Sequence, residues 1–356
     1  MEEKRLIYLD YIRILATLSV IMAHVSCVNW LSSRIGSFEW CVFNFYDSIS
    51  RWSVDGFVMI SGALFLKKDI KLKRLYKHSI LKLVIIYIIW SEIYGLIDYV
   101  EGVRGGLDVR YTLKTFILGL INGHFHLWFI PMIIGVYMCI PFIKAIKEKG
   151  LTRYFLLLSF LFSSLFPQFL LIVGLYGGEG FSDYIKAIEN YNSSMHLKMI
   201  MEYMGLFLLG DYLNEKTFEG KKKNAIYILG IVGTAYTIVM TYMTCIVKNE
   251  VTEAFFDNFA VGVIFSAIGI FVFLKNLKLD EKLNPFVVFL SKNCFGVYLI
   301  HVLIINVINN YIGITTLSFN PIFACLIICI MTYFISLVIV AGTKRIFEGV
   351  RKSFIV

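Results

Sequence analysis

Two ionisable residues, Arg13 and His24, interrupt the first long apolar stretch of the sequence. An imidazole can take up a proton near neutral pH, whereas a guanidinium stays charged and binds anions. At about 100° per residue, the steps from Arg13 to His24 return to almost the same face of a helix, roughly 16 Å further along its axis. Because ionisable groups are costly in hydrocarbon, we expect this face to line a polar seam inside the protein.

The composition indicates that the elements positioning these residues are transmembrane helices. Hydrophobic residues make up 58% of the chain and charged residues 17%, and the mean hydropathy is +0.74, unlike an ordinary soluble domain. About ten apolar runs are long enough to span a bilayer. They lie near residues 6–28, 43–66, 79–100, 126–143, 151–173, 197–213, 225–247, 257–275, 293–313 and 321–342. The apolar piece at 112–122 is too short, so we expect it to be re-entrant or interfacial.

Lysine and arginine gather in every second connection between these predicted spans. The basic connections lie near residues 4–5, 67–82, 144–153, 216–223, 275–292 and 344–352. Cytoplasmic loops are enriched in these residues, so we predict an all-α polytopic membrane protein with both termini in the cytoplasm. The net charge of +9 then reflects topology, and we expect no nucleic-acid partner.

We expect residues 1–356 to form a single membrane-embedded domain without a fused soluble domain, because no long linker, repeat or low-complexity tract interrupts the chain. The first apolar segment does not read as a cleavable signal peptide, since Asp10 and Arg13 interrupt it. The seven cysteines lack paired metal-ligand spacing, and we expect them to pack as small apolar residues without a metal site. Ser61-Gly62 reads as a close-packing point between helices rather than as a nucleophile.

Four segments, taken in order, resemble one known family. They are LDYIRILATLSVIMAHV from residue 9, SRWSVDGFVMISGALFLKK from residue 50, HLWFIPMIIGVYMCIPFI from residue 126 and FGVYLIHVLII from residue 295. They are similar to the landmarks of the acyltransferase-3 family of integral-membrane acyltransferases. The arrangement is most similar to the branch that contains the enterobacterial-common-antigen O-acetyltransferase, which has no fused extracellular domain. One departure is Asp55, where many relatives carry proline.

The resemblance implies that His24 is a general base, which takes the proton of an acceptor hydroxyl as that hydroxyl attacks a thioester. The alternative is a helix histidine bonded to a neighbour. Arg13 either pairs structurally with Asp10, three residues earlier on the same face, or faces the phosphates or pantetheine of an acyl-CoA donor. Basic residues after the second span either hold the CoA phosphates or follow from topology alone. These are Lys67, Lys68, Lys73 and Arg74.

Arg51 and Asp55 lie one helical turn apart and either pair with each other or bind the substrate, with Arg51 polarising the acyl carbonyl or orienting a sugar. Glu92, inside the third span, is either a site residue or a structural hydrogen-bonding group.

His126 and His301 are further candidates for the catalytic machinery, either orienting the acceptor or supporting other site residues. Tyr298 lies one turn before His301 and joins the substrate-binding candidates. Exposure at helix ends explains the remaining histidines, His78, His124 and His196.

The sequence therefore predicts an acyltransferase of the cell membrane. We expect it to move an acyl group, acetyl in the first instance, from cytoplasmic acetyl-CoA to a hydroxyl of a cell-surface glycan or lipid-linked saccharide, with no permanently bound cofactor. A transporter or exporter of a small polar molecule is the main alternative, because substrate pathways also run through polar seams. A structural subunit of a polysaccharide export assembly is a third, and it leaves Arg13 and His24 unexplained.

Overall fold

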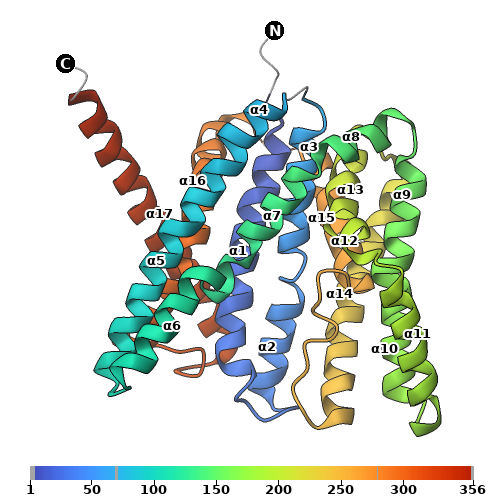
Figure 1. Ribbon diagram of the computed structural model, residues 1–356, viewed down its shortest axis with the longest axis horizontal. Helices are drawn as coiled ribbons and strands as arrows, with labels where there is room; N and C mark the ends of the chain where they lie inside the picture. The colour runs from blue at the N-terminus through green and yellow to red at the C-terminus, as the bar shows by residue number, and fades with distance from the viewer. Residues whose placement is uncertain (1–4, 69–70, 279, 354–356) are drawn as a thin grey trace. The chain divides into compact units, whose positions relative to one another are not determined.

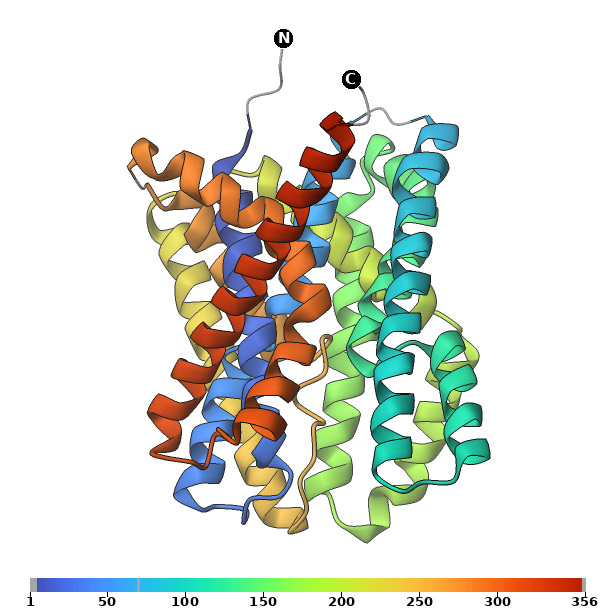
Figure 2. The ribbon, with the colours of Figure 1, turned by 90° about the vertical axis from the view of Figure 1, so that its left-hand side faces the viewer.

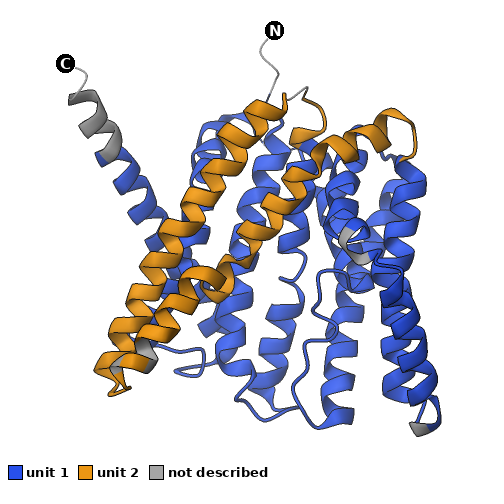
Figure 3. Ribbon diagram, in the orientation of Figure 1, with its two compact units in different colours: residues 1–63, 152–356 blue, residues 64–151 orange. Residues whose placement is uncertain are grey.

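A computed structural model describes residues 5–68, 71–278 and 280–353. Every described element of regular secondary structure is a helix (Figure 1), which confirms the all-α prediction. The chain divides into two compact units, coloured separately in Figure 3. Unit 1 comprises residues 1–63 and 152–356, and unit 2 comprises residues 64–151.

Within the described residues, seven helices are long and apolar enough to cross a membrane. They are Ile7–Trp30, Leu72–Arg104, Leu113–Met138, Thr152–Tyr176, Gly220–Lys248, Glu281–Ile312 and Pro321–Ile346. They agree with seven of the predicted spans, and the other three are shorter or divided. Residues 43–66 break at Arg51, residues 197–213 break at Glu202, and residues 257–275 form a helix of only 16 residues. Polar side chains interrupt the first two of these spans, which explains their division.

The centre of unit 1 is α1 (Ile7–Trp30). It packs against α2 (Phe38–Ser48), α15 (Val261–Asn276), α16 (Asn284–Asn306) and α17 (Pro321–Ser353) (Figures 1 and 2). One face of α1 is therefore covered by helices from the other end of the chain. The remaining helices of the unit are α3 (Ser53–Phe65), α9 (Thr152–Ser159), η3 (Phe160–Leu165), α10 (Phe166–Tyr176), η4 (Glu179–Phe181), α11 (Ser182–Ser194), α12 (Lys198–Met201), α13 (Tyr203–Glu215), α14 (Gly220–Lys248), η5 (Glu281–Leu283) and η6 (Val307–Ile312).

Two glycines let α3 and α13 of unit 1 approach each other closely. A Cβ atom added to Gly62 of α3 would overlap the Phe207 carbonyl of α13, and one added to Gly210 of α13 would overlap the Met59 carbonyl of α3. Ser61 turns its hydroxyl to the Phe57 carbonyl of its own helix, at 2.9 Å. Ser61-Gly62 is thus a packing point, as the sequence predicts.

Unit 2 is built around α5 (Leu81–Arg104) and α6 (Val109–Asn122), which folds back along it. The Tyr87 hydroxyl donates to the Ile121 carbonyl at 3.2 Å, and the Tyr99 and Phe116 rings lie 6.2 Å apart. The short piece predicted at 112–122 is thus a helix packed on α5 and part of the apolar run 113–138. The other helices of the unit are α4 (Leu72–Arg74), η1 (Leu75–Ile80), η2 (Phe125–Trp128), α7 (Phe129–Met138) and α8 (Ile140–Glu148).

The basic connections of unit 1 meet at one end. The Lys344 ammonium donates to the Lys292 carbonyl and to Oδ1 of Asn293, both at 2.9 Å. These groups adjoin the residues of α16 that contact the beginning of α1. Lys275 donates to the carbonyls of Leu213, Asn214 and Lys216 at 2.7–2.8 Å, and Tyr8 of α1 donates to Asn214.

In unit 2, Lys144 donates to the Lys68 carbonyl, which joins two basic connections there as well. Residues 69–70 of the second basic connection, and Lys4 of the first, lie outside the described residues.

Candidate active site

The polar face of α1 lies against α16, and the two helices run parallel. Ser291 of α16 contacts the Asp10 and Arg13 side chains of α1. His301, further along α16, has its ring centroid 5.2 Å from that of His24. Arg13 and His24 therefore face the same neighbouring helix, as their spacing predicts. We name this interface the α1–α16 seam, formed by Asp10, Arg13, Thr17 and His24 of α1 with Ser291, Cys294 and His301 of α16.

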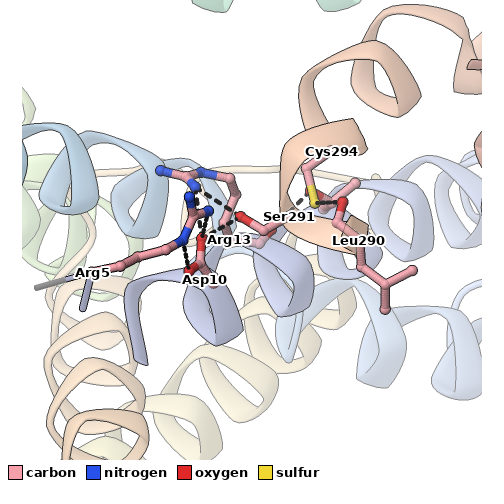
Figure 4. Close-up of polar contacts among 7 residues, drawn as sticks. Arg5, Asp10, Arg13, Leu290, Ser291 and Cys294 are labelled. Carbon is pink, nitrogen blue, oxygen red and sulfur yellow. Dashed lines mark hydrogen bonds and ion pairs between the residues drawn. The ribbon is translucent and has the colours of Figure 1, made fainter. Parts of the chain in front are cut away.

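At one end of the seam, the buried Asp10 carboxylate gathers two guanidinium groups (Figure 4). Arg5 donates to both carboxylate oxygens at 2.7 Å. Nη1 of Arg13 donates to Oδ1 of Asp10 at 3.2 Å and to Oγ of Ser291 at 2.8 Å. The Ser291 hydroxyl in turn donates to Oδ1 of Asp10 at 2.6 Å. Two cations share one carboxylate, so this end of the seam carries a net positive charge.

Arg5 is a site residue that sequence reasoning assigned to topology alone. It precedes α1, so helical periodicity gives no signal for its contact with Asp10. Its hydrogen bonds to that carboxylate raise the pKa of the Arg5 guanidinium, which keeps it charged. The Arg5 and Arg13 side chains are 45% and 26% exposed. The predicted Asp10–Arg13 pair exists, and both arginines remain accessible to an anion.

Small polar groups continue the seam toward its other end. The Thr17 hydroxyl donates to the Arg13 carbonyl at 2.8 Å. Cys294 of α16 interacts with Thr17 and donates to the Leu290 carbonyl at 3.5 Å (Figure 4).

The second end of the seam consists of two imidazoles. His301 is fully buried, and its Nδ1 lies 2.6 Å from the Tyr298 carbonyl oxygen. A carbonyl only accepts hydrogen bonds, so Nδ1 carries the proton and Nε2 carries the lone pair of the neutral ring. The Tyr298 ring also stacks on His301, at 5.9 Å. His301 is therefore fixed in orientation and tautomer beside the half-buried His24.

The turn between α2 and α3 holds Arg51 close to the same part of α1. Arg51 donates to Asp47 at 2.6 Å, lies 4.0 Å from Glu253 and covers the Phe256 ring at 4.2 Å. Its charge acts on Cys27, one turn beyond His24. The predicted alternative of an Arg51–Asp55 pair is wrong. The helix breaks between the two residues, and Asp47 in the last turn of α2 reaches the guanidinium instead.

Asp55 lies in the first turn of α3 and is fully buried. Neither of its carboxylate oxygens has a hydrogen-bond partner among the described residues. The sequence marked Asp55 as a departure from the proline of many relatives and as a partner of Arg51 or a substrate-binding residue, and it gave no signal for this isolation, which comes from tertiary packing.

In unit 2, His126 belongs to a compact aromatic cluster. Its Nδ1 lies 2.8 Å from Nδ1 of His124, and the Tyr94 ring lies 4.5 Å from His124 and 4.8 Å from His126. Exposure therefore does not explain His124, which is half-buried and lies within hydrogen-bonding distance of His126. The His-x-His spacing was the available signal for this contact.

The other predicted site residues of unit 2 lie on its surface. Glu92 is exposed on α5 and its side chain forms no hydrogen bond with the described residues. The four predicted phosphate ligands are also exposed; they are Lys67, Lys68, Lys73 and Arg74.

Comparison with known proteins identifies the family. No curated protein and no solved structure matches the chain. A family model described as an acyltransferase domain, Acyl_transf_3, matches residues 6–341. This range contains both ends of the α1–α16 seam and all of unit 2, so the chain belongs to the acyltransferase-3 family of membrane acyltransferases.

Proposed function

We propose that this membrane acyltransferase transfers acetyl from acetyl-CoA to a hydroxyl of a cell-surface glycan or lipid-linked saccharide. The observation that carries the proposal is the α1–α16 seam. One pair of parallel helices presents a net positive cluster at one end and two imidazoles at the other. The sequence resemblance to the enterobacterial-common-antigen O-acetyltransferase branch supports acetyl as the group and a saccharide as the acceptor.

The Asp10 end suits an anionic donor. Arg5 and Arg13 share one carboxylate, and both hydrogen bonds that Arg13 makes to described side chains are donated by Nη1. A phosphate or pantetheine amide of CoA could accept hydrogen bonds from the remaining guanidinium donors. The thioester would then extend along the seam past Thr17 and Cys294. The exposed cations of unit 2 that the sequence predicts as phosphate ligands, Lys67, Lys68, Lys73 and Arg74, keep that proposed role as a basic cluster of unit 2 itself.

The imidazole end suits the chemical step. His24 takes the proton of the acceptor hydroxyl as its oxygen attacks the thioester carbonyl. A carbon–oxygen bond forms, the carbon–sulfur bond breaks, and the CoA thiolate leaves to be protonated. His301 positions His24 through its fixed ring, and Arg51 stabilises the negative charge that develops on the carbonyl oxygen. In unit 2, the pair formed by His126 and His124 is proposed as a saccharide-binding group of that unit.

We further infer that the basic end of each unit faces the cytoplasm. Lysines and arginines from several connections meet at one end of unit 1, and cytoplasmic loops are enriched in these residues. This orientation places donor binding in the cytoplasm and transfer toward the outer face of the cell membrane, with about ten crossings and both termini inside. Each of the three divided or short segments then crosses the membrane as a broken or a short span.

Release of CoA thiol by the purified protein tests the proposal. The protein in detergent should convert acetyl-CoA to free CoA, faster when saccharides extracted from the cell envelope are added. The His24→Ala variant serves as the control for contaminating thioesterases. Absence of thiol release above this control, with and without acceptor, would contradict acyl transfer and favour a transporter. Mass spectrometry of surface glycans from wild-type and deletion strains would then identify the acetylated hydroxyl.

A further inference from the structure

Asp55 is a buried carboxylate to which the proposed proton transfer gives no role. It is 0% exposed, and both of its oxygens lack a hydrogen-bond partner among the described residues. Asp10, by contrast, is equally buried but accepts hydrogen bonds from Arg5, Arg13 and Ser291. An ionised carboxylate buried without a donor is strongly unfavourable. Asp55 therefore requires either a proton of its own or a cation from outside the chain.

The surroundings of Asp55 favour a cation. The Asp257 carboxylate repels Asp55 electrostatically. Asp55, Asp257 and Glu202 all act on the Tyr203 hydroxyl, which accepts a hydrogen bond from Nδ2 of Asn258 at 3.0 Å. The charged groups that act on Asp55 and Tyr203 are thus acidic. A positively charged group would relieve repulsion among several carboxylates at once.

Residues 249–260 supply a route by which such a group could arrive. This non-helical segment rises from the lower end of α14 toward α15 (Figures 1 and 2). Glu253 is 54% exposed and Asp257 is also exposed. Irregular backbone and charged side chains at membrane depth are tolerated only inside protein or beside water. The exposed Glu253 and Asp257 therefore indicate that this segment meets water rather than lipid.

We propose that Asp55 binds a primary ammonium group of the acceptor, such as the free amino group of an amino sugar. Asp257 supplies the second carboxylate, and Tyr203 with Asn258 supplies neutral hydrogen-bonding groups beside it. The assignment of this ligand as the acceptor rests on the proposed acyl transfer. Carboxylates disfavour a phosphate at this position, so the recognised part of the acceptor is cationic rather than phosphorylated.

Thermal unfolding of the purified full-length protein in detergent tests this site with D-glucosamine as the probe. Glucosamine should raise the unfolding midpoint of the wild type in a concentration-dependent way, whereas N-acetylglucosamine and glucose should not. For the same shift of the unfolding midpoint, Asp55→Asn should require at least about 30-fold more glucosamine, because one partner of a buried charge pair is lost. Asp257→Asn, at an exposed position, should require about three- to fivefold more. Asp183→Asn, an exposed acid on α11, should behave as the wild type.

Unchanged glucosamine affinity in Asp55→Asn would overturn the proposal. An amide can replace a carboxyl without loss of binding only if that carboxyl is protonated and does not pair with the ammonium group. A wild type that does not distinguish glucosamine from N-acetylglucosamine would also overturn it. If Asp55→Asn does not fold, unchanged affinity in Asp257→Asn has the same meaning. Acetyl-CoA binding and thiol release, measured on the same samples, report separately on the proposed function. Asp55-dependent glucosamine binding without thiol release would refute acyl transfer and leave the ammonium site standing.

Discussion

The two ends of the α1–α16 seam differ in how their polar groups are held. Asp10 accepts four hydrogen bonds, from Arg5, Arg13 and Ser291, which fix the charges in place. At the other end, His301 is fixed by the Tyr298 carbonyl, while His24 is half-buried beside it. A permanently charged, rigid cluster suits binding of an anion, whereas an accessible imidazole can gain and lose a proton. In the proposed mechanism, donor binding and the chemical step are therefore separated along one helix pair.

The largest effect should come from His24→Ala. We expect transfer to fall by at least about 10²-fold, because general-base catalysis contributes that much. Acetyl-CoA affinity and the amount of protein in the membrane should stay near wild type, since the binding end is untouched. Activity assays and immunoblots of the same membranes measure both. Retention of more than about a tenth of the activity would remove His24 from the role of base.

Arg13→Lys should affect the opposite end of the seam. Lysine keeps the charge but not the planar fork of donors, so we expect acetyl-CoA affinity to fall about tenfold with little change in acceptor affinity. Asp10→Asn and Arg13→Gln provide the structural comparison. If the Asp10–Arg13 pair is only structural, Asp10→Asn and Arg13→Gln each lose thermal stability, and the double variant that carries both changes recovers much of it. Arg13→Lys then binds acetyl-CoA as the wild type does.

His301 should give a smaller effect on the rate. His301→Leu removes the ring that positions His24, and we expect the kcat of transfer to fall about three- to tenfold with the KM for acetyl-CoA unchanged. His301→Asn keeps a donor for the Tyr298 carbonyl and should recover part of the rate. An equal loss of thermal stability in both variants, without a change in kcat, would show that His301 is only a packing residue.

Ser291→Ala should give the smallest effect. It removes one of the four hydrogen bonds to Asp10 and the acceptor of one Arg13 hydrogen bond, but both arginines stay. We therefore expect a loss of about 1–2 kcal/mol in the free energy of unfolding. Acetyl-CoA affinity should change less than in Arg13→Lys. Denaturation in detergent and a binding isotherm measure the two quantities, and a larger loss of affinity than in Arg13→Lys would reverse the assigned roles.

Helical periodicity is a local property, and it was sufficient to predict that Arg13 and His24 share a face. The small residues Ser61 and Gly62 predicted a packing point. The helical class and the family also followed from composition and short motifs. The basic residues predicted which connections share an end within unit 1.

Local sequence patterns could not predict the contacts between segments that are distant in the chain. Arg51 pairs with Asp47 because the chain breaks between α2 and α3, and an i, i+4 rule assumes an unbroken helix. Arg5 joins Asp10 from outside the helix, and the isolation of Asp55 depends on residues some 200 positions away in the chain. The three divided or short spans have the same origin, since hydropathy averages over polar interruptions that tertiary contacts can satisfy.

Acetyl transfer in sealed vesicles of known orientation tests whether the donor binds at the basic end of the α1–α16 seam. Single cysteines at Ser182 and Lys222, on a cysteine-free background, report the orientation through labelling with an impermeant reagent. We predict labelling of the Ser182 probe from outside and protection of the Lys222 probe. The protein should consume radiolabelled acetyl-CoA only when it is supplied on the side of Lys222. The label should then appear in envelope saccharide on the side of Ser182. Consumption of acetyl-CoA from the Ser182 side, or labelling of the Lys222 probe from outside, would contradict donor binding at a cytoplasmic basic end of the seam.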